Sequence, residues 1–332
     1  METGLRPWLF LLGVLAASPA VAQPKGPSFD CAKAVSAIDR TICKDADLGK
    51  ADRALVAAYT ALLERLKGAE REALVKDQGR WVATRNRVCQ QVSDEMASCL
   101  KQRYVQRTAT LQAMAQTPFV AIGEQTLSGR GRFDQLSWSY EIAYPRFEAK
   151  GVDFAATNTR FAGDALKSAQ EATPSDLTEV EDERTWDYQQ GFDVARAPGG
   201  TLLNVAVSYY AYTGGAHGNG ATLCQAIDLR SGRIVAPAGL FVGEWRQQLY
   251  RLVVADLRTQ FKERPGDEDS LKPDAMNKML GESTRYCWGA KQLEILFNPY
   301  EVGPYAAGPY SVELSYERLK PLLRADGPIA QR

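Results

Sequence analysis

The sequence has only one histidine, His217, among 332 residues. A histidine-based metal site needs further ligands, and a histidine-activated nucleophile needs a serine or cysteine beside it. There is no second histidine, and no G-x-S-x-G motif marks an activated serine. We therefore expect no metal, no catalytic residue and no enzymatic activity.

Nucleotide-binding signatures are also missing. Neither G-x-x-x-x-G-K-[ST] nor a G-x-G-x-x-G that opens a helix is found. The most glycine-rich segment, GGAHGNG at 214–220, lacks the lysine that would hold phosphates. The sequence therefore predicts no cofactor, and we expect no nucleic-acid partner.

After the N-terminal segment, no apolar run approaches 18 residues. We therefore expect no membrane anchor. The first 22 residues combine Arg6, an apolar run at 8–17 and an A-x-A site at 20–22. This pattern is typical of a secretory signal peptide at 1–22. We expect cleavage near Ala22, a mature chain that begins at Gln23, and a periplasmic or secreted location.

Cysteines are few, and in an oxidising compartment they favour disulfides over metal sites. Four lie in the first third and two in the remainder, so each part can pair internally. The disulfide candidates are Cys31, Cys43, Cys89, Cys99, Cys224 and Cys287. Cys89 and Cys99 flank a turn, and Cys31 could then pair with Cys43, but four cysteines allow three connectivities. Pairing of Cys224 with Cys287 would join the central hairpin to a late strand.

The formal net charge of zero conceals an asymmetry. Residues 23–117 hold 16 Lys and Arg against 11 Asp and Glu, whereas residues 118–332 hold 23 against 28. The first part is basic and the second acidic. This bears on the choice of partners and not on the fold.

Residues 28–115 are predicted to form helices only. Ser36 and Asp39 resemble a capping box at the start of a short helix. Apolar residues then recur at helical spacing. These residues are Leu48, Leu55, Tyr59, Leu62, Leu66, Leu74, Trp81, Leu100, Tyr104 and Leu111. We expect Tyr59 and Trp81 to be core, and Arg85 and Arg107 to form ion pairs with Asp39 or Asp52.

Residues 116–122 are predicted to be a linker, and residues 123–325 a second domain. DQLSWSYEIAYPRF (134–147) alternates as a strand does, and Ser231-Gly232 marks a hairpin turn. Trp186 and Tyr188 alternate on another strand and are expected in the core. Because strands and helices do not alternate strictly, we predict α+β overall: a disulfide-linked helical bundle, then a mostly antiparallel sheet flanked by helices.

The candidate site begins with the segment YTGGAHGNG (212–220), which contains Tyr212, His217 and Asn219. Its glycines suit a backbone that needs positive φ between two strands. One interpretation is a structured turn in which His217 hydrogen-bonds to local backbone. The other is a turn that also binds a partner.

A second candidate is the segment NPYEVGPYAAGPY (298–310), with Pro299, Tyr300, Pro304, Tyr305 and Tyr310. Tyrosines on a proline-stiffened loop lose little entropy on binding and offer both an apolar face and a hydroxyl. They suit a partner-binding surface, or they pack the loop onto the sheet. The acidic segment at 178–187 is either a solvated face or a surface that steers a cationic partner.

Residues 28–115 resemble a known family. The segments FDCAKAVSAIDRTICKDADLGKADRALVAAY, QGRWVATRNRVC and SCLKQRYVQRTATL are similar to the LprI-like lysozyme-inhibitor domain of secreted bacterial proteins. The resemblance implies a small, disulfide-linked helical bundle. It also implies lysozyme inhibition, the activity of one branch of that family.

Residues 120–325 carry a second resemblance, in YTGGAHGN, IDLRSGRIV and LFNPYEVGPYAAGPYSVELSYERLKPLL. These segments resemble the extracellular domain of the anti-sigma factor RsiV and the accessory domain of the peptidoglycan deacetylase PdaC. In RsiV that domain binds lysozyme. Counterparts of the sigma-binding segment and of the deacetylase domain are not found here, so the resemblance implies only the ectodomain role.

The leading prediction is an exported binding protein whose partner is a lysozyme-type muramidase, inhibited by steric occlusion of its glycan cleft. The predicted partner-binding residues are Tyr212, His217, Asn219, Pro299, Tyr300, Pro304 and Tyr305. Two alternatives stay open. One is a peptidoglycan- or glycan-binding cell-envelope module without enzymatic activity, and the other is a hydrolase that uses His217.

Overall fold

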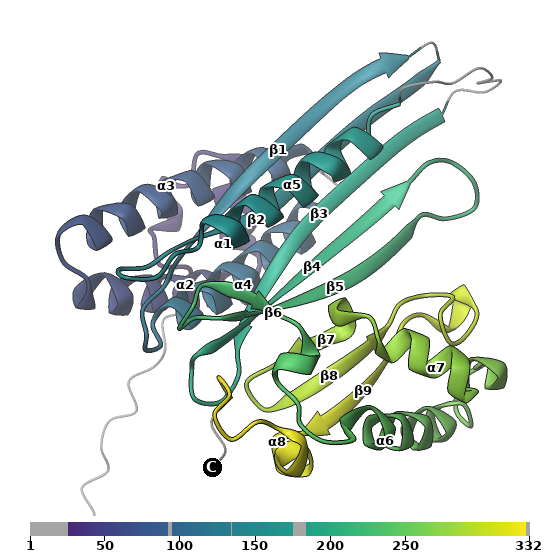
Figure 1. Ribbon diagram of the computed structural model, residues 1–332. Coiled ribbons are helices and arrows are strands. Elements are labelled where there is room, and N and C mark those ends of the chain that lie inside the picture. The colour runs from purple at the N-terminus through teal and green to yellow at the C-terminus, as the bar shows by residue number, and fades with distance from the viewer. Residues whose placement is uncertain (1–25, 92–94, 134, 175–183, 330–332) are drawn as a thin grey trace, which may run out of the picture.

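The structure, a computed structural model, describes residues 26–91, 95–133, 135–174 and 184–329. The expected signal peptide at 1–22 and the acidic residues 178–183 lie outside the described residues. A helical bundle comes first, and a strand-rich part with helices follows (Figure 1). This confirms the predicted fold class. Within the described residues, no helix is both long and apolar enough to span a membrane.

The bundle begins with a short 3-10 turn followed by helices. Its elements are η1 (Cys31–Lys33), α1 (Ala37–Lys44), α2 (Ala46–Arg65), α3 (Gly68–Gln91) and α4 (Met96–Met114). The capping box is confirmed: the Asp39 amide donates to Ser36 Oγ at 2.9 Å, and the Ser36 amide donates to the Asp39 carboxylate at 3.4 Å. The side chain of Asp45 caps α2 in the same way, accepting from the amides of Asp47 and Leu48. Capping therefore sets where both helices begin.

Two disulfides connect neighbouring parts of the bundle. Cys31 bonds to Cys43 and Cys89 bonds to Cys99, with Cα–Cα separations of 5.8 Å and 5.6 Å. Of the three connectivities that the sequence allowed, the structure has the local one. The first bond joins η1 to α1, and the second joins α3 to α4.

A polar network lies inside the bundle, centred on Tyr104, which is 1% exposed. Its hydroxyl donates to Asp52 Oδ1 at 2.9 Å and accepts from Arg85 Nη1 at 2.8 Å. Burial, the largest effect, raises the pKa of this phenol, so the hydroxyl keeps its proton. Arg85 therefore reaches Asp52 through the tyrosine and not by the direct ion pair expected from the sequence.

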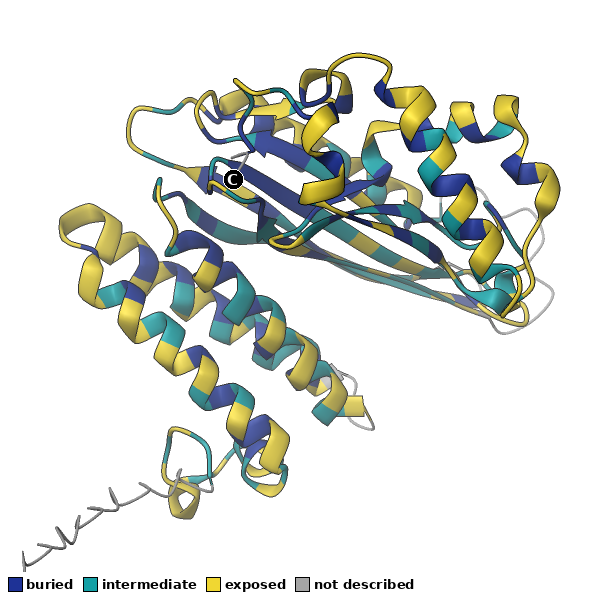
Figure 2. Cartoon of the chain, turned by 90° about the horizontal axis from the view of Figure 1, so that it is seen from below, coloured by how far each residue is buried: buried dark blue, intermediate teal, exposed yellow. Residues whose placement is uncertain are grey.

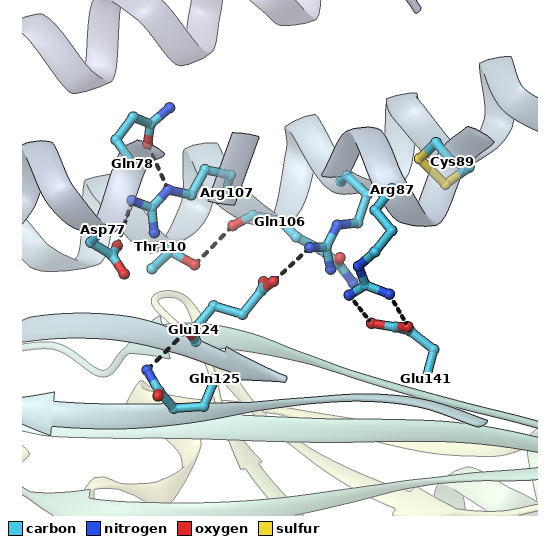
Figure 3. A network of polar contacts seen from close by, with 12 residues as sticks. Asp77, Gln78, Arg87, Cys89, Gln106, Arg107, Thr110, Glu124, Gln125 and Glu141 are labelled. Atoms are coloured by element: carbon cyan, nitrogen blue, oxygen red, sulfur yellow. Dashed lines mark hydrogen bonds and ion pairs between the residues drawn. A yellow bond between two sulfur atoms is a disulfide. The ribbon is translucent and has the colours of Figure 1, made fainter. Parts of the chain in front are cut away.

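The prediction that Arg107 pairs with Asp39 or Asp52 was wrong. Arg107 Nη2 pairs with Asp77 Oδ2 on α3 at 2.7 Å, and its Nε donates to Gln78 at 2.9 Å (Figure 3). Asp77 was not a candidate because the helical period alone does not say how α3 is rotated against α4. Trp81 is core at 3% exposed, as expected, whereas Tyr59 is half-buried at its edge.

The second part contains two sheets. The larger one follows chain order: β1 (Ala121–Phe133), β2 (Leu136–Glu148), β3 (Arg184–Arg196), β4 (Leu202–Tyr212), β5 (Asn219–Asp228) and β6 (Arg233–Val235). The smaller one contains β7 (Tyr286–Trp288), β8 (Gln292–Phe297) and β9 (Tyr310–Ser315). Every pairing is antiparallel except that of β2 with β3. The mostly antiparallel sheet is thus confirmed.

Helices accompany these sheets. They are α5 (Ala155–Glu171), α6 (Trp245–Gln260), α7 (Pro273–Leu280) and α8 (Tyr316–Leu319), with the 3-10 turns η3 (Pro237–Gly239), η4 (Glu268–Leu271), η5 (Ser283–Arg285), η6 (Tyr305–Ala307) and η7 (Lys320–Leu322). A parallel pair needs a crossover connection, and α5 is that connection between β2 and β3. Figure 2 shows buried residues in stripes along the helices, as expected where one helix face packs on a core.

The two faces of the large sheet are covered by different helices (Figure 1). On β2, Glu141 accepts two bonds from Arg87 of α3, at 2.6 Å and 2.8 Å (Figure 3), while the next residue, Ile142, packs against Ala165 of α5. Successive strand residues point to opposite faces. The bundle therefore packs on one face of the sheet and α5 on the other.

The C-terminal part has its own core. It is built on β7 to β9 and α6, with Trp288, Tyr286 and Tyr310 each 1% exposed. The third disulfide joins Cys224 of β5 to Cys287 of β7, with a Cα–Cα separation of 5.2 Å. This bond ties the small sheet to the large one.

The three disulfides should differ in how much they stabilise the fold. The Cys224–Cys287 bond spans 63 residues and the Cys31–Cys43 bond spans 12. Loop-closure entropy then predicts about 4 kcal/mol and about 3 kcal/mol of stabilisation. Thermal unfolding followed by circular dichroism should show a larger drop in midpoint for C224A/C287A than for C31A/C43A. An equal or smaller drop would contradict the larger contribution expected of the longer loop.

Tyr104→Phe should destabilise the bundle by about 1–3 kcal/mol, because Asp52 and Arg85 lose a buried hydrogen-bond partner. Denaturant titration of the oxidised protein measures this loss. Tyr300→Phe is the matched control, because Tyr300 is 61% exposed and a surface change of this kind should stay within about 0.5 kcal/mol. Equal effects of the two variants would show that the network contributes nothing.

Candidate functional site

The segment 212–220 is the turn between β4 and β5, as one of the two sequence interpretations expected. Gly214 and Gly215 have φ of 94° and 92°, a region that other residues rarely adopt. His217 Nδ1 donates to the carbonyl oxygen of Gly218 at 2.8 Å. The predicted hydrogen bond from His217 to local backbone is thereby confirmed.

Gly218 makes backbone hydrogen bonds that hold this turn in place. Its amide donates to the Tyr210 hydroxyl at 3.0 Å, and its carbonyl also accepts from the Tyr305 hydroxyl at 2.8 Å. A Cβ on this residue would lie 2.3 Å from the Tyr210 ring, so only glycine fits. The carbonyl of Gly218 thus connects the turn to a loop 87 residues further along the chain.

The rings of His217 and Tyr305 stack on each other. Their centroids are 3.8 Å apart and their planes differ by 10°. Tyr300 follows, with its ring centroid 5.4 Å from that of Tyr305. The structure therefore brings three predicted site residues, from two distant segments, into one aromatic cluster, which we call the His–Tyr cluster (His217, Tyr300, Tyr305).

Additional contacts hold the 298–310 loop in place. The Asn298 carboxamide accepts from the Thr222 amide of β5 at 2.8 Å and donates to its carbonyl at 3.4 Å. The Glu301 carboxylate accepts from the Asn298 amide at 2.8 Å and pairs with the buried Arg285 guanidinium at 3.0 Å. These contacts hold the start of the loop, and the ring stack with His217 holds Tyr305. The loop therefore has little conformational freedom to lose when a partner binds.

The three tyrosines of this loop have different roles. Tyr310 is 1% exposed, and its hydroxyl donates to the Pro265 carbonyl, so it is core. Tyr300 is 61% exposed with φ of 72°, an unusual conformation for a tyrosine. Tyr305 is half-buried beneath it. The sequence left open whether these tyrosines pack the loop onto the sheet or form a surface. Tyr310 packs the loop, whereas Tyr300 and Tyr305 lie at the surface.

The remaining predicted site residues flank the cluster. Pro304 is exposed and precedes the turn η6, and Pro299 is half-buried beside Tyr300. The Tyr212 hydroxyl donates to the Gly215 carbonyl at 3.0 Å. Tyr212 and Asn219 point instead to a neighbouring groove on the large sheet.

Trp186 and Tyr188 line that groove and are half-buried. Tyr188 packs against the buried cluster of Ile142, Ala165 and Ala169 and so lies at the edge of the core, whereas the core placement expected for Trp186 was wrong. The alternation of large apolar residues along β3 is the same whether the face that they share is covered or open. Tyr209 and Gln225, which also line the groove, were missed for the same reason. For Gln225, its position between the buried Cys224 and Ala226 was the one available signal.

The contacts of His217 bear on what the cluster can do chemically. The side-chain contacts of His217 in the described chain are with an aromatic ring and a backbone carbonyl. A general base of the histidine type is normally oriented by a carboxylate. Within the described residues, no three His, Cys, Asp or Glu side chains converge in a way that could hold a metal ion.

Two family models match parts of the chain. The model of the lysozyme inhibitor LprI matches residues 31–111, and that of a protein of unknown function, DUF3298, matches residues 238–317. Among curated proteins, none matches.

Two solved structures are similar in part. A DUF3298 family protein from Pseudomonas aeruginosa PAO1 is 14% identical, with 64% of this chain and 98% of that chain covered and a TM-score of 0.46. A DUF3298 member from Bacteroides fragilis is 17% identical, with 62% and 94% covered and a TM-score of 0.38. The sequence resemblance of the first part is confirmed, and that of the second part agrees with the DUF3298 match. Residues 31–111 are thus similar to the LprI lysozyme-inhibitor family, and residues 238–317 are similar to DUF3298.

Proposed function

We propose that this protein binds a lysozyme-type muramidase and inhibits it by covering the glycan cleft of the enzyme. The observation that carries the proposal is the His–Tyr cluster, in which a turn and a loop distant in sequence present one rigid aromatic surface. The LprI domain supports the class of partner, because that family is described as a lysozyme inhibitor.

The cluster has the physical properties of a binding hot spot. Such sites are enriched in tyrosine and are held in place before the partner arrives. Tyr300 offers an exposed ring, Tyr305 supports it, and the stack with His217 together with the bond to Gly218 orders the support. Few side chains of this surface need to be ordered when a partner binds. Less of the favourable contact free energy is therefore offset by lost conformational entropy.

Charge supports the same partner. Residues 118–332, which contain the cluster, hold 28 acidic and 23 basic side chains. A surface of this balance attracts a basic protein at low ionic strength, and salt weakens that attraction. The three disulfides fit an exported protein, because disulfides persist in oxidising compartments.

The direct test is calorimetric titration of residues 23–332 with vertebrate-type and invertebrate-type lysozymes, with cell-wall lysis measured in parallel. We expect binding that weakens with salt, inhibition of lysis, and an affinity at least about tenfold lower for Tyr300→Ala, since truncation of a hot-spot ring has this effect. Leu166→Ala is the control: Leu166 is 54% exposed on α5, outside the cluster. No binding to either lysozyme at any salt concentration would remove the proposal.

His217 offers a separate test that also addresses the hydrolase alternative. His217→Ala loses the stack that supports Tyr305, so lysozyme affinity should fall several-fold, with about 1 kcal/mol lost in stability. His217→Phe keeps an aromatic ring and should retain most of the affinity. A hydrolytic activity that both variants abolish would show instead that the imidazole itself reacts.

A further inference from the structure

A groove crosses the face of the large sheet that α5 only partly covers. It lies over β3, β4 and β5, and its lining also includes residues of α5 and Thr284 of the C-terminal part. Its volume is about 560 Å³, within the range of small-molecule sites. The turn at 212–220 forms one of its borders, through Tyr212 and Asn219.

Strand register places aromatic side chains on the floor of this groove. Gln190 pairs with Tyr209 across β3 and β4, and Tyr188 lies two residues before Gln190 on the same face. The rings of Tyr188 and Tyr209 are nearly parallel, at 14°, with centroids 5.7 Å apart. Both side chains are half-buried, so part of each ring faces the groove.

An amide group in the floor has an unused hydrogen-bond acceptor. Gln225 lies on β5, and its Oε1 atom is buried with no hydrogen-bond partner in the described part of the chain. A buried acceptor without a partner costs free energy, and rotation of the Gln225 carboxamide toward the groove would let a ligand hydroxyl or N–H group recover it. The groove therefore combines ring surface with an acceptor that needs a donor.

The charges around the groove are already paired. On α5, Arg160 pairs with Asp164 at 2.7 Å and Lys167 with Glu171 at 3.7 Å. On β3, Asp187 lies between Trp186 and Tyr188 and points to the opposite face of the sheet, where it accepts from Ser139 Oγ at 2.7 Å. A charged ligand would find no uncompensated opposite charge among these pairs, so the groove favours a neutral ligand.

We propose that this groove binds a short, uncharged oligosaccharide. Sugar rings have flat C–H faces that pack on aromatic side chains, and their hydroxyl groups donate to amide oxygens. Tyr188 and Tyr209 supply the ring surface, and Gln225 Oε1 accepts from the saccharide. The site is separate from the His–Tyr cluster and does not depend on the proposed lysozyme binding.

The test uses the whole mature chain, 23–332, and the tetramer of β-1,4-linked N-acetylglucosamine as the probe. Calorimetry or chemical-shift titration should detect saturable binding in the wild type. Gln225→Met keeps the length of the side chain and removes the acceptor, so affinity should fall at least about fivefold while the thermal midpoint stays or rises. Tyr209→Ala should weaken binding as well.

Two controls separate this site from the other one. Tyr300→Ala should leave saccharide affinity unchanged, and Gln225→Met should leave lysozyme affinity unchanged. A galacturonic acid tetramer, which is charged, should bind more weakly than the neutral probe. The proposal is overturned by the absence of saturable binding at millimolar probe, by undiminished binding in Gln225→Met, or by equal binding of the acidic tetramer.

Discussion

The large sheet is the element against which the other parts of the described chain pack. Its strands follow chain order, and its one parallel pair, β2 with β3, places α5 across one face. The helical bundle packs on the opposite face, and the small sheet is tied to β5 by the Cys224–Cys287 bond. The part of β3 to β5 that these elements leave uncovered forms the floor of the groove.

Contact between the bundle and the sheet is apolar at its centre and charged around it. Leu111 and Met114 belong to the same buried core as Ile122 and Ala143. The ion pair of Arg103 with Glu124, at 2.6 Å, has both side chains less than 15% exposed (13% and 12%). Because both charges are largely removed from water, leaving either one without its partner would cost free energy, so the pair favours this placement of α4 on the sheet.

The two surfaces proposed to bind partners use different physical means. The His–Tyr cluster lies on loops and gains its rigidity from one ring stack and the shared carbonyl of Gly218. The groove lies on strands, so its side chains are positioned by register. Loops positioned by a rigid scaffold commonly carry recognition, and both surfaces here border the same β4–β5 hairpin.

Local features were predictable from the sequence because they depend on near neighbours. Helical periodicity, the capping box at Ser36 and the glycine-rich turn at 214–220 follow from spacing and backbone preference. The local disulfides were among the pairings allowed, and the structure selected them. Sequence resemblance also identified the LprI part, which the family model confirms.

Long-range relations were decided only by the tertiary structure. Spacing cannot show that Arg107 meets Asp77, because helix rotation depends on the packing of the whole bundle. Nor can it show that His217 stacks on Tyr305, since that contact needs β5 and the 298–310 loop to lie side by side. The alternation of Tyr188 and Tyr209 along their own strands is a property of the sequence, whereas the register of β3 with β4 places both on one face. That this face stays open is a property of the fold, because it depends on where α5 and the small sheet stop covering it.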